Sequence, residues 1–186
     1  MPKPKAIHFT GNPEADALLA DDPFALLVGF ALDQQVTVPT AFLGPLKIKQ
    51  WLGHLDPAKI AALPPDGLDT VFRQPPAVHR FPGNMATRVR ELAATIAADY
   101  DGDTSRLWKT ATSSEELERR IRALPGFGDM KVVGYGSTLA KRLGVKLAEP
   151  LVPDHPCLGD VDSPEALEVY QAAKRAKKAA ARAAAT

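Results

Sequence analysis

The chain has 186 residues, of which 45% are apolar and 24% charged, and this composition is typical of a globular protein. The longest apolar run is residues 24–32, less than half of what a membrane-spanning helix needs. A single cysteine, Cys157, excludes an internal disulfide framework and a four-cysteine zinc or iron–sulfur site. The first residues lack the apolar stretch of a secretory signal. We therefore expect a cytoplasmic monomer without cofactor, metal ion or membrane contact.

The formal net charge of +1 hides an uneven distribution along the chain. Residues 171–186 carry five basic side chains and no acidic one, which leaves 18 basic and 22 acidic side chains in the other 170 residues. The body is therefore mildly acidic and the tail is basic. A basic tail is a common means of binding polyanions, although it also serves simply to keep a helix end in solution.

Apolar positions recur at helical spacing, with proline and glycine between the periodic segments, so an all-α fold is expected. The first helix should open at Asn12-Pro13 and bury Leu18 and Leu19. The second should run from Phe24 to about Thr37 and, being apolar almost all round, form the buried centre. A third helix follows from Pro39 to Gly53, with Trp51 on its inner face.

The second half of the chain continues this pattern. We expect a short helix after Asp56-Pro57, a proline-rich connection over residues 64–83 with one helical turn, and a fifth helix from there to Tyr100. A short element should carry Trp108, and Ser113 with Glu116 forms a capping box that opens a sixth helix. A seventh helix ends at Leu143, residues 145–162 form a loop, and Ser163-Pro164 opens a last helix. The expected domain is therefore residues 12–162, followed by a C-terminal helix and basic tail over 163–186.

The most informative stretch is Leu124-Pro125-Gly126-Phe127-Gly128, which joins two amphipathic helices. Paired glycines permit positive φ angles and let a ligand approach the bare backbone. The helix that follows begins with unpaired N–H groups and the positive end of its dipole. Together these features predict an anion site for one phosphate, independent of base sequence.

This stretch resembles the hairpin of the helix-hairpin-helix/Gly-Pro-Asp superfamily of base-excision DNA glycosylases, which includes endonuclease III and the 3-methyladenine glycosylases. The matching residues are Leu124, Pro125, Gly126, Phe127, Gly128 and Val132. The resemblance implies a compact, multi-helix bundle that binds double-stranded DNA containing a damaged base. In the absence of an iron–sulfur cluster, this chain would be a compact variant of that fold.

Two other segments are similar to the family in the expected order. Residues 27–37 resemble its early buried helix, and the resemblance makes Gln35, with Gln34 beside it, the residue that reaches DNA and fills the gap left by an extruded base. Residues 80–92 resemble its turn-and-helix before the hairpin, where Phe81 or Met85 would serve either as an intercalating wedge or as a core residue. The simpler interpretation of Gln35 is a solvated helix end.

The chemistry implied is cleavage of an N-glycosidic bond, in which a carboxylate stabilises the oxocarbenium-like sugar and orients water. The family's lysine nucleophile, where present, lies two residues after the second hairpin glycine, and here that position holds Met130. We expect Met130 to line the base pocket. Lys131 is rotated by about 100° from it and should point toward phosphate or solvent. The resemblance therefore implies a monofunctional glycosylase without β-lyase activity.

The family's catalytic aspartate lies in a Gly/Pro/Val-Asp turn after the hairpin, and Val152-Pro153-Asp154 resembles that turn. Asp154 follows Met130 by 24 residues, more than the resemblance implies, whereas the rival Glu149 follows by 19. The prolyl loop after Asp154 also departs from the family's long helix. A third interpretation assigns neither carboxylate a function, because Pro-Asp turns are common in ordinary loops.

Three functions remain open from the sequence. The first is a DNA glycosylase that uses Asp154, with Gln35, Gly126, Gly128 and Lys131 on the DNA. The second is a catalytically inactive protein of the same fold that binds damaged or distorted duplex. The third is a small helical interaction protein in which the hairpin is only a turn.

Overall fold

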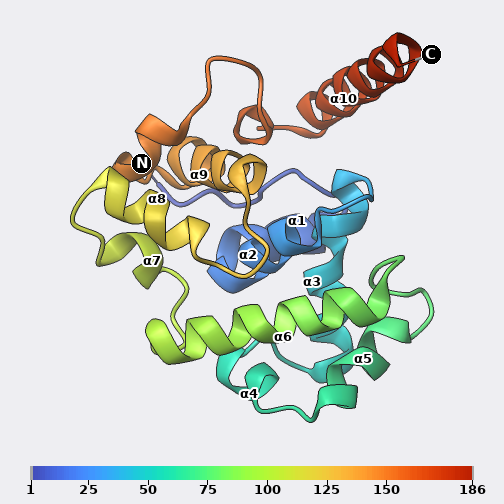
Figure 1. Ribbon diagram of the computed structural model, residues 1–186, viewed down its shortest axis with the longest axis vertical. Coiled ribbons are helices and arrows are strands. Elements are labelled where there is room, and N and C mark those ends of the chain that lie inside the picture. The colour runs from blue at the N-terminus through green and yellow to red at the C-terminus, as the bar shows by residue number, and fades with distance from the viewer. Residues whose placement is uncertain (1, 186) are drawn as a thin grey trace.

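The computed structural model describes residues 2–185, and within them the chain is all-α, without a β-strand (Figure 1). The α-helices are α1 Pro13–Asp21, α2 Pro23–Leu32, α3 Val38–Leu52, α4 Pro57–Ala61, α5 Pro65–Arg73, α6 Pro82–Asp99, α7 Arg106–Lys109, α8 Ser114–Arg122, α9 Asp129–Leu143 and α10 Pro164–Ala184. The 3-10 helices η1 Lys146–Leu151 and η2 Leu158–Asp160 lie between α9 and α10. None of the helices within this described part has the length and apolar character that crossing a bilayer requires.

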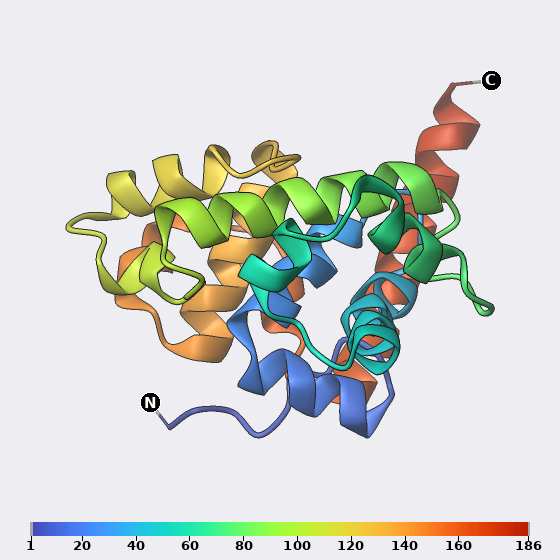
Figure 2. The same cartoon turned by 90° about the horizontal axis from the view of Figure 1, so that it is seen from below.

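Helix α2 is the centre of the core, as the sequence predicts. Every residue from Phe24 to Leu32 is buried. The ring of Phe30 meets those of Phe9, Phe42 and Tyr135 edge-on, with centroid distances of 6.4, 5.0 and 5.3 Å. The N-terminal segment, α3 and α9 therefore pack around one helix, while α6 runs along another side of it (Figure 2).

The N-terminal segment before residue 12 also belongs to the core. Ile7 and Phe9 are fully buried. The buried carboxylate of Asp16 accepts hydrogen bonds from the Thr10 amide at 2.9 Å and the Thr10 hydroxyl at 2.7 Å. These bonds fix the segment across α1, so the packed body begins before the expected boundary at residue 12.

The single helical turn expected within residues 64–83 is the nine-residue helix α5, and four further local predictions were wrong. Helix α2 ends at Leu32 rather than near Thr37, because Gln35 has a φ of +56° and Thr37 already caps α3. Trp51 is 54% exposed instead of facing the core, and Leu52 packs against the core from the same turn of α3. The expected loop after α9 contains η1 and η2.

The fourth concerns the capping box of α8, which is only half formed. Ser113 accepts from the Glu116 amide at 3.1 Å, but the Glu116 carboxylate binds the Thr112 amide at 2.8 Å and the Thr112 hydroxyl at 2.6 Å. Hydrogen bonds from Thr112 and then from Arg120 lower the pKa of Glu116 to about 2. Glu116 therefore stays ionised and holds the entry to α8.

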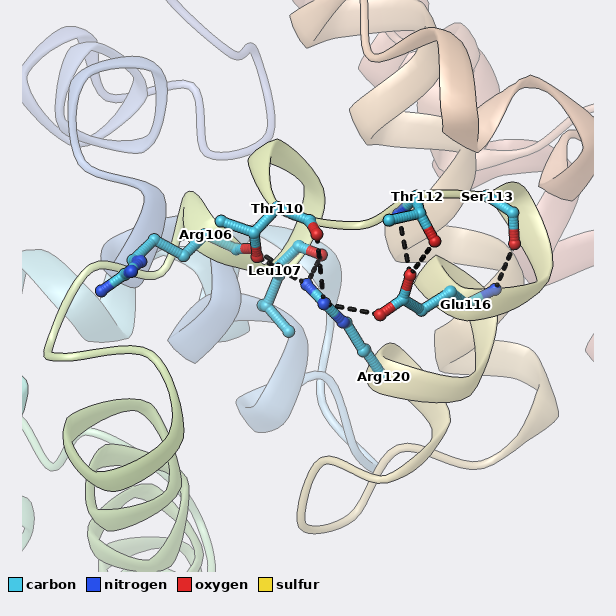
Figure 3. Close-up of polar contacts among 7 residues, drawn as sticks. All are labelled: Arg106, Leu107, Thr110, Thr112, Ser113, Glu116 and Arg120. Atoms are coloured by element: carbon cyan, nitrogen blue, oxygen red, sulfur yellow. Dashed lines mark hydrogen bonds and ion pairs between the residues drawn. The ribbon is translucent and has the colours of Figure 1, made fainter.

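Arg120 joins α8 to the preceding short helix α7 (Figure 3). Its guanidinium donates to the backbone carbonyls of Arg106 and Leu107, each at 3.2 Å, and to the carboxylate of Glu116 at 2.6 Å. A further bond reaches the Thr110 hydroxyl at 2.8 Å. One side chain thus satisfies carbonyls at the end of α7 and fixes the direction in which α8 approaches the hairpin.

Candidate functional site

In the turn between α8 and α9, one of the two glycines adopts the positive φ that the sequence predicts and the other does not. Leu124 and Phe127 are buried and anchor the turn, and the Phe127 ring lies against Tyr135 of α9 at 6.0 Å. Gly126 has a φ of +79°, the left-handed region that favours glycine. Gly128 has an ordinary φ of −85° and caps α9 with open space where a side chain would be. In Figure 1 this turn lies over α2.

The start of α9 leaves backbone amides available to a ligand. No side chain caps this helix, and its first helical hydrogen bond runs from the Val132 amide to the Gly128 carbonyl at 3.0 Å. The amides of residues 129–131 therefore precede the helical ladder. The exposed carboxylate of Asp129 lies at the same end and pairs with Arg122 of α8, whose other nitrogen binds Glu118. An anion arriving here competes with Asp129 for the positive helix end.

Arg88 of α6 is the nearest cation to the hairpin backbone. A side-chain carbon added at Gly126 would overlap the Arg88 guanidinium. Arg88 is partly exposed, and its one ion pair with another residue of the described part is long, 3.8 Å to Glu91. The hairpin glycine and a positive charge from a distant helix therefore share one small area of surface.

The turn that carries Gln34 and Gln35 is held by a buried histidine. His79 Nε2 lies 3.1 Å from the carbonyls of both Leu32 and Gln34, while His79 Nδ1 accepts the Phe81 amide at 3.0 Å. Because Nδ1 accepts, the proton must reside on Nε2 and the ring is neutral. Burial lowers the pKa of His79 and keeps it so. His79 thus joins residues 32–35 to residues 79–81.

The structure separates the two proposed wedge residues. Met85 is buried on the inner face of α6 and is a core residue. Phe81 is 36% exposed, and the guanidinium of Arg80 lies 4.9 Å from the centre of its ring. Only Phe81 is therefore placed where it can meet a partner.

Lys131 does not point toward solvent as expected. It is half-buried, and its Nζ donates to the Ala31 carbonyl near the end of α2 at 2.9 Å. Burial lowers its pKa, an effect that nearby Asp33 opposes. The expectation failed because the end of α2 lies directly beneath the first turn of α9 and offers an acceptor.

The side chain of Asp33, which follows α2 and precedes Gln34, is only 20% exposed. Burial raises its pKa, while Lys174 and Lys131 act in the opposite direction. The Nζ of Lys174 on α10 lies 4.0 Å from Asp33 Oδ1. A carboxylate therefore lies between two lysines, one residue from the glutamine turn. Its ion pairs are long-range contacts, so no local sequence pattern reveals them.

Met130, the expected pocket residue, is 87% exposed on the outer side of the first turn of α9. In this chain alone it lies on the surface, and a role in a base pocket would require that DNA or a movement of the turn cover it. Its role stays a prediction. Within the first turn of α9 the inward positions are those of Val132, which is buried, and the half-buried Lys131.

Asp154 lies at an exposed bend, residues 154–155, within the segment 152–157 that arches above α9 in Figure 1. Among the described residues it has no hydrogen bond or ion pair. The segment is anchored beyond it, where Asp160 binds the Cys157 amide at 2.8 Å and pairs with Lys141. Lys141 lies about 16 Å along α9 from Met130, at the end opposite to the hairpin. The rival Glu149 is exposed in η1.

Two surface hollows, of about 280 and 310 Å³, lie along the N-terminal segment. The first is lined by Lys3, Leu19, Trp108 and Leu143 among others, and no residue of the hairpin or of the glutamine turn contributes to either. They offer no support for a base pocket beside Met130.

The structure thus brings together three segments that are far apart in the sequence: the glutamine turn, the Arg80–Phe81 turn and the hairpin. We call this area the candidate DNA surface; its residues are Gln34, Gln35, Arg80, Phe81, Arg88, Gly126, Gly128 and Lys131. Sequence reasoning missed the contacts that assemble it, those of His79, Arg88 and Lys131. Comparisons with protein-family models, with curated proteins and with solved structures found no match to this chain.

Proposed function

We propose that this protein binds double-stranded DNA at the candidate DNA surface and acts in base-excision repair as a monofunctional DNA glycosylase. The observation that carries the proposal is the convergence of the three segments. His79 joins the glutamine turn to the Phe81 turn, Lys131 joins the glutamine turn to α9, and Arg88 covers the hairpin. A plain helix–helix turn has no need of such neighbours.

Each part of this surface has a chemical task in the proposed complex. The free amides at the start of α9, with Arg88 beside them, suit one backbone phosphate. Gln35 is exposed in a left-handed conformation, which costs about 1 kcal/mol or more for a residue other than glycine and is often found at functional sites. It is placed to enter the stack when a damaged base is extruded, and Phe81 is placed to support the distorted pair.

Hydrolysis then requires a carboxylate near C1′ of the extruded nucleotide, to stabilise positive charge on the sugar and to orient water. Asp154 is the residue that the sequence favours, and DNA binding would have to bring its exposed loop to the site. Asp33 is the carboxylate already beside the glutamine turn. The proposal gives the base-releasing role to one of these two, and site-directed variants decide between them.

The binding step is tested with Gly128→Val. The φ of Gly128 is ordinary and open space surrounds the added side chain, so the variant should fold normally while its bulk blocks access to the α9 amides. We expect affinity for a duplex with a tetrahydrofuran abasic analogue to fall about tenfold, equally for different flanking sequences. Ala58→Val on exposed α4 is the matched control and should bind normally. Equal binding by both variants would exclude the phosphate site.

The chemical step is tested on a panel of duplexes with alkylated, deaminated or oxidised bases. We expect one class to yield abasic sites, with strand breaks appearing only after treatment with hot alkali, because hydrolysis leaves the backbone intact. Either Asp154→Asn or Asp33→Asn should abolish base release while DNA binding persists. Strand cleavage without alkali, with a borohydride-trapped adduct at Lys131, would contradict the monofunctional assignment.

The second candidate function is binding to damaged or distorted duplex without catalysis. The placement of Asp154 favours it, since this residue lies in an exposed bend whose anchor is at the far end of α9. It predicts tight binding to the abasic analogue and no base release from any duplex in the panel.

A further inference from the structure

The C-terminal helix α10 differs from every other helix in how little of it contacts the body. Leu167 is buried and Tyr170 is partly buried against the core, but from residue 172 to residue 185 each residue is exposed. In both views its end projects beyond the other helices (Figures 1 and 2). Only its first two turns therefore contribute to the core, and the rest needs another explanation.

The projecting part is strongly basic. Four of the five residues from Lys174 to Lys178 are lysine or arginine, Arg182 follows, and the last acidic residue of the sequence is Glu168. The remaining positions beyond Gln171 are almost entirely alanine, so this part of the helix has no large apolar side chains to insert into a bilayer. Its chemistry suits a polyanion bound at its surface rather than a membrane or an apolar groove.

The position of this basic stretch supplies the second observation. Lys174 lies 4.0 Å from Asp33, the residue next to Gln34. The positive charge of Lys131, in the first turn of α9, also acts to lower the pKa of Asp33. The basic part of α10 therefore starts at the edge of the candidate DNA surface, and Asp33 lies between it and the hairpin.

We propose that α10 is an arm that binds backbone phosphates of the same duplex, beside the nucleotides held by the hairpin. This inference rests on the proposed function. The residues from Lys174 to Lys178 span about 6 Å of helix axis, which corresponds to roughly two nucleotides of one strand. Long lysine and arginine side chains reach phosphates on either side of that span. The arm strengthens binding without reading base sequence.

The test is the triple variant Arg175→Gln/Lys177→Gln/Lys178→Gln, which leaves the Lys174 anchor in place. Glutamine keeps a helix propensity close to that of lysine and arginine, so the fold should be unchanged by circular dichroism. The matched control is Lys5→Gln/Lys59→Gln/Lys109→Gln, which removes three exposed charges outside the candidate DNA surface. Affinity of the full chain for the abasic-analogue duplex is measured from 50 to 300 mM salt.

We expect the α10 variant to bind about tenfold more weakly at physiological salt and its log–log salt slope to fall by about two to three units. The control should keep most of the wild-type slope. Equal losses of affinity in the two variants would show that net charge alone causes the effect, and would contradict a specific role for α10. An unchanged salt slope in the α10 variant would contradict it as well. Tighter binding of wild type to anionic phosphatidylserine vesicles than to DNA would also overturn it.

The same measurement separates this inference from the proposed function. If the wild-type chain binds DNA and the α10 variant binds it equally well, the proposed role of α10 is wrong while the hairpin site stands. If the wild-type chain does not bind the duplex at all, the proposed function fails and the arm fails with it.

Discussion

The candidate DNA surface and the segment 152–157 both carry residues that the sequence singles out, but they are built differently. In the first, buried contacts from distant parts of the chain hold each turn, through His79 and Lys131. In the second, Asp154 has no polar partner among the described residues, and the segment is held only on either side of it, by the Val152 amide on the Glu149 carbonyl and by Asp160. The candidate DNA surface is therefore prearranged, whereas a catalytic role for Asp154 would depend on rearrangement.

The largest difference between these regions should appear on truncation of Phe127. This side chain is 4% exposed and packs against Tyr135, so Phe127→Ala should lower the free energy of unfolding by about 3–4 kcal/mol. Asp154→Ala should change it by less than about 0.5 kcal/mol, since the residue is exposed and without partners. Urea unfolding measures both. Equal effects would show that the hairpin is as loosely held as the loop.

His79 should come next. His79→Ala removes the contacts with the Leu32 and Gln34 carbonyls and the acceptor for the Phe81 amide, at a cost of about 2–3 kcal/mol. DNA affinity should fall as well, because both turns lose their support. His155→Ala, in the exposed bend, is the control and should have little effect on either quantity. A His79 variant that keeps full stability would show that the two turns keep their conformation without the hydrogen bonds of His79.

The same histidine predicts a pH dependence. Burial lowers the pKa of His79 below its ordinary value of 6.5, so the unfolded chain takes up this proton before the folded chain does. The contribution of the neutral His79 ring to the free energy of unfolding is complete above pH 6.5. It is lost as the pH falls from there toward the lowered pKa of the folded state. Unfolding free energies measured between pH 8 and pH 5.5 should therefore converge for wild type and His79→Ala. A constant gap between the two curves would contradict the buried, neutral ring.

The two hairpin glycines should differ in their tolerance to alanine. Gly126→Ala puts a side chain at a φ of +79° and into the Arg88 guanidinium, which should cost about 1–2 kcal/mol. Gly128→Ala has an ordinary φ and open space, so it should change stability by less than about 0.5 kcal/mol. Thermal unfolding of the pair measures the difference, and the reverse order would show that the turn has another conformation.

The smallest effect concerns Asp129 at the proposed phosphate site. Asp129→Asn removes a carboxylate that competes for the α9 amides and frees Arg122 from one of its two ion pairs. We expect affinity for the duplex to rise by about threefold to tenfold. Asp66→Asn, an exposed exchange in the first turn of α5, is the control for charge alone. Weaker binding by the Asp129 variant would exclude an anion site at this helix start.

The sequence predicts the helices well because their signals are local. Asn12, Asp22, Ser113 and Ser163 each cap the helix that follows them, and the central apolar run is buried as its composition predicts. Gly126 has the positive φ that the glycine pair predicts, although Gly128 does not. Such features depend on neighbours within about four residues, which a single sequence contains.

The contacts that assemble the site could not be predicted in this way. The end of α2 depends on His79, which lies 47 residues beyond Leu32. The direction of the Lys131 side chain depends on the Ala31 carbonyl, 100 residues earlier in the chain. Helix geometry places Lys131 about 100° around the helix from Met130, but it does not identify this partner. The pair of Asp33 with Lys174 requires the position of α10, which no local pattern sets.

We propose that three turns form one prearranged surface for duplex DNA. Amide chemical-shift mapping by NMR can detect whether all three meet the duplex together. On titration with an abasic-analogue duplex, we expect the largest shifts to lie together in residues 33–36, 79–84 and 126–131. The shifts of the three segments should grow in proportion to one another as duplex is added. Shifts confined to the hollows of the N-terminal segment, or shifts at the hairpin without any at the glutamine turn, would contradict it.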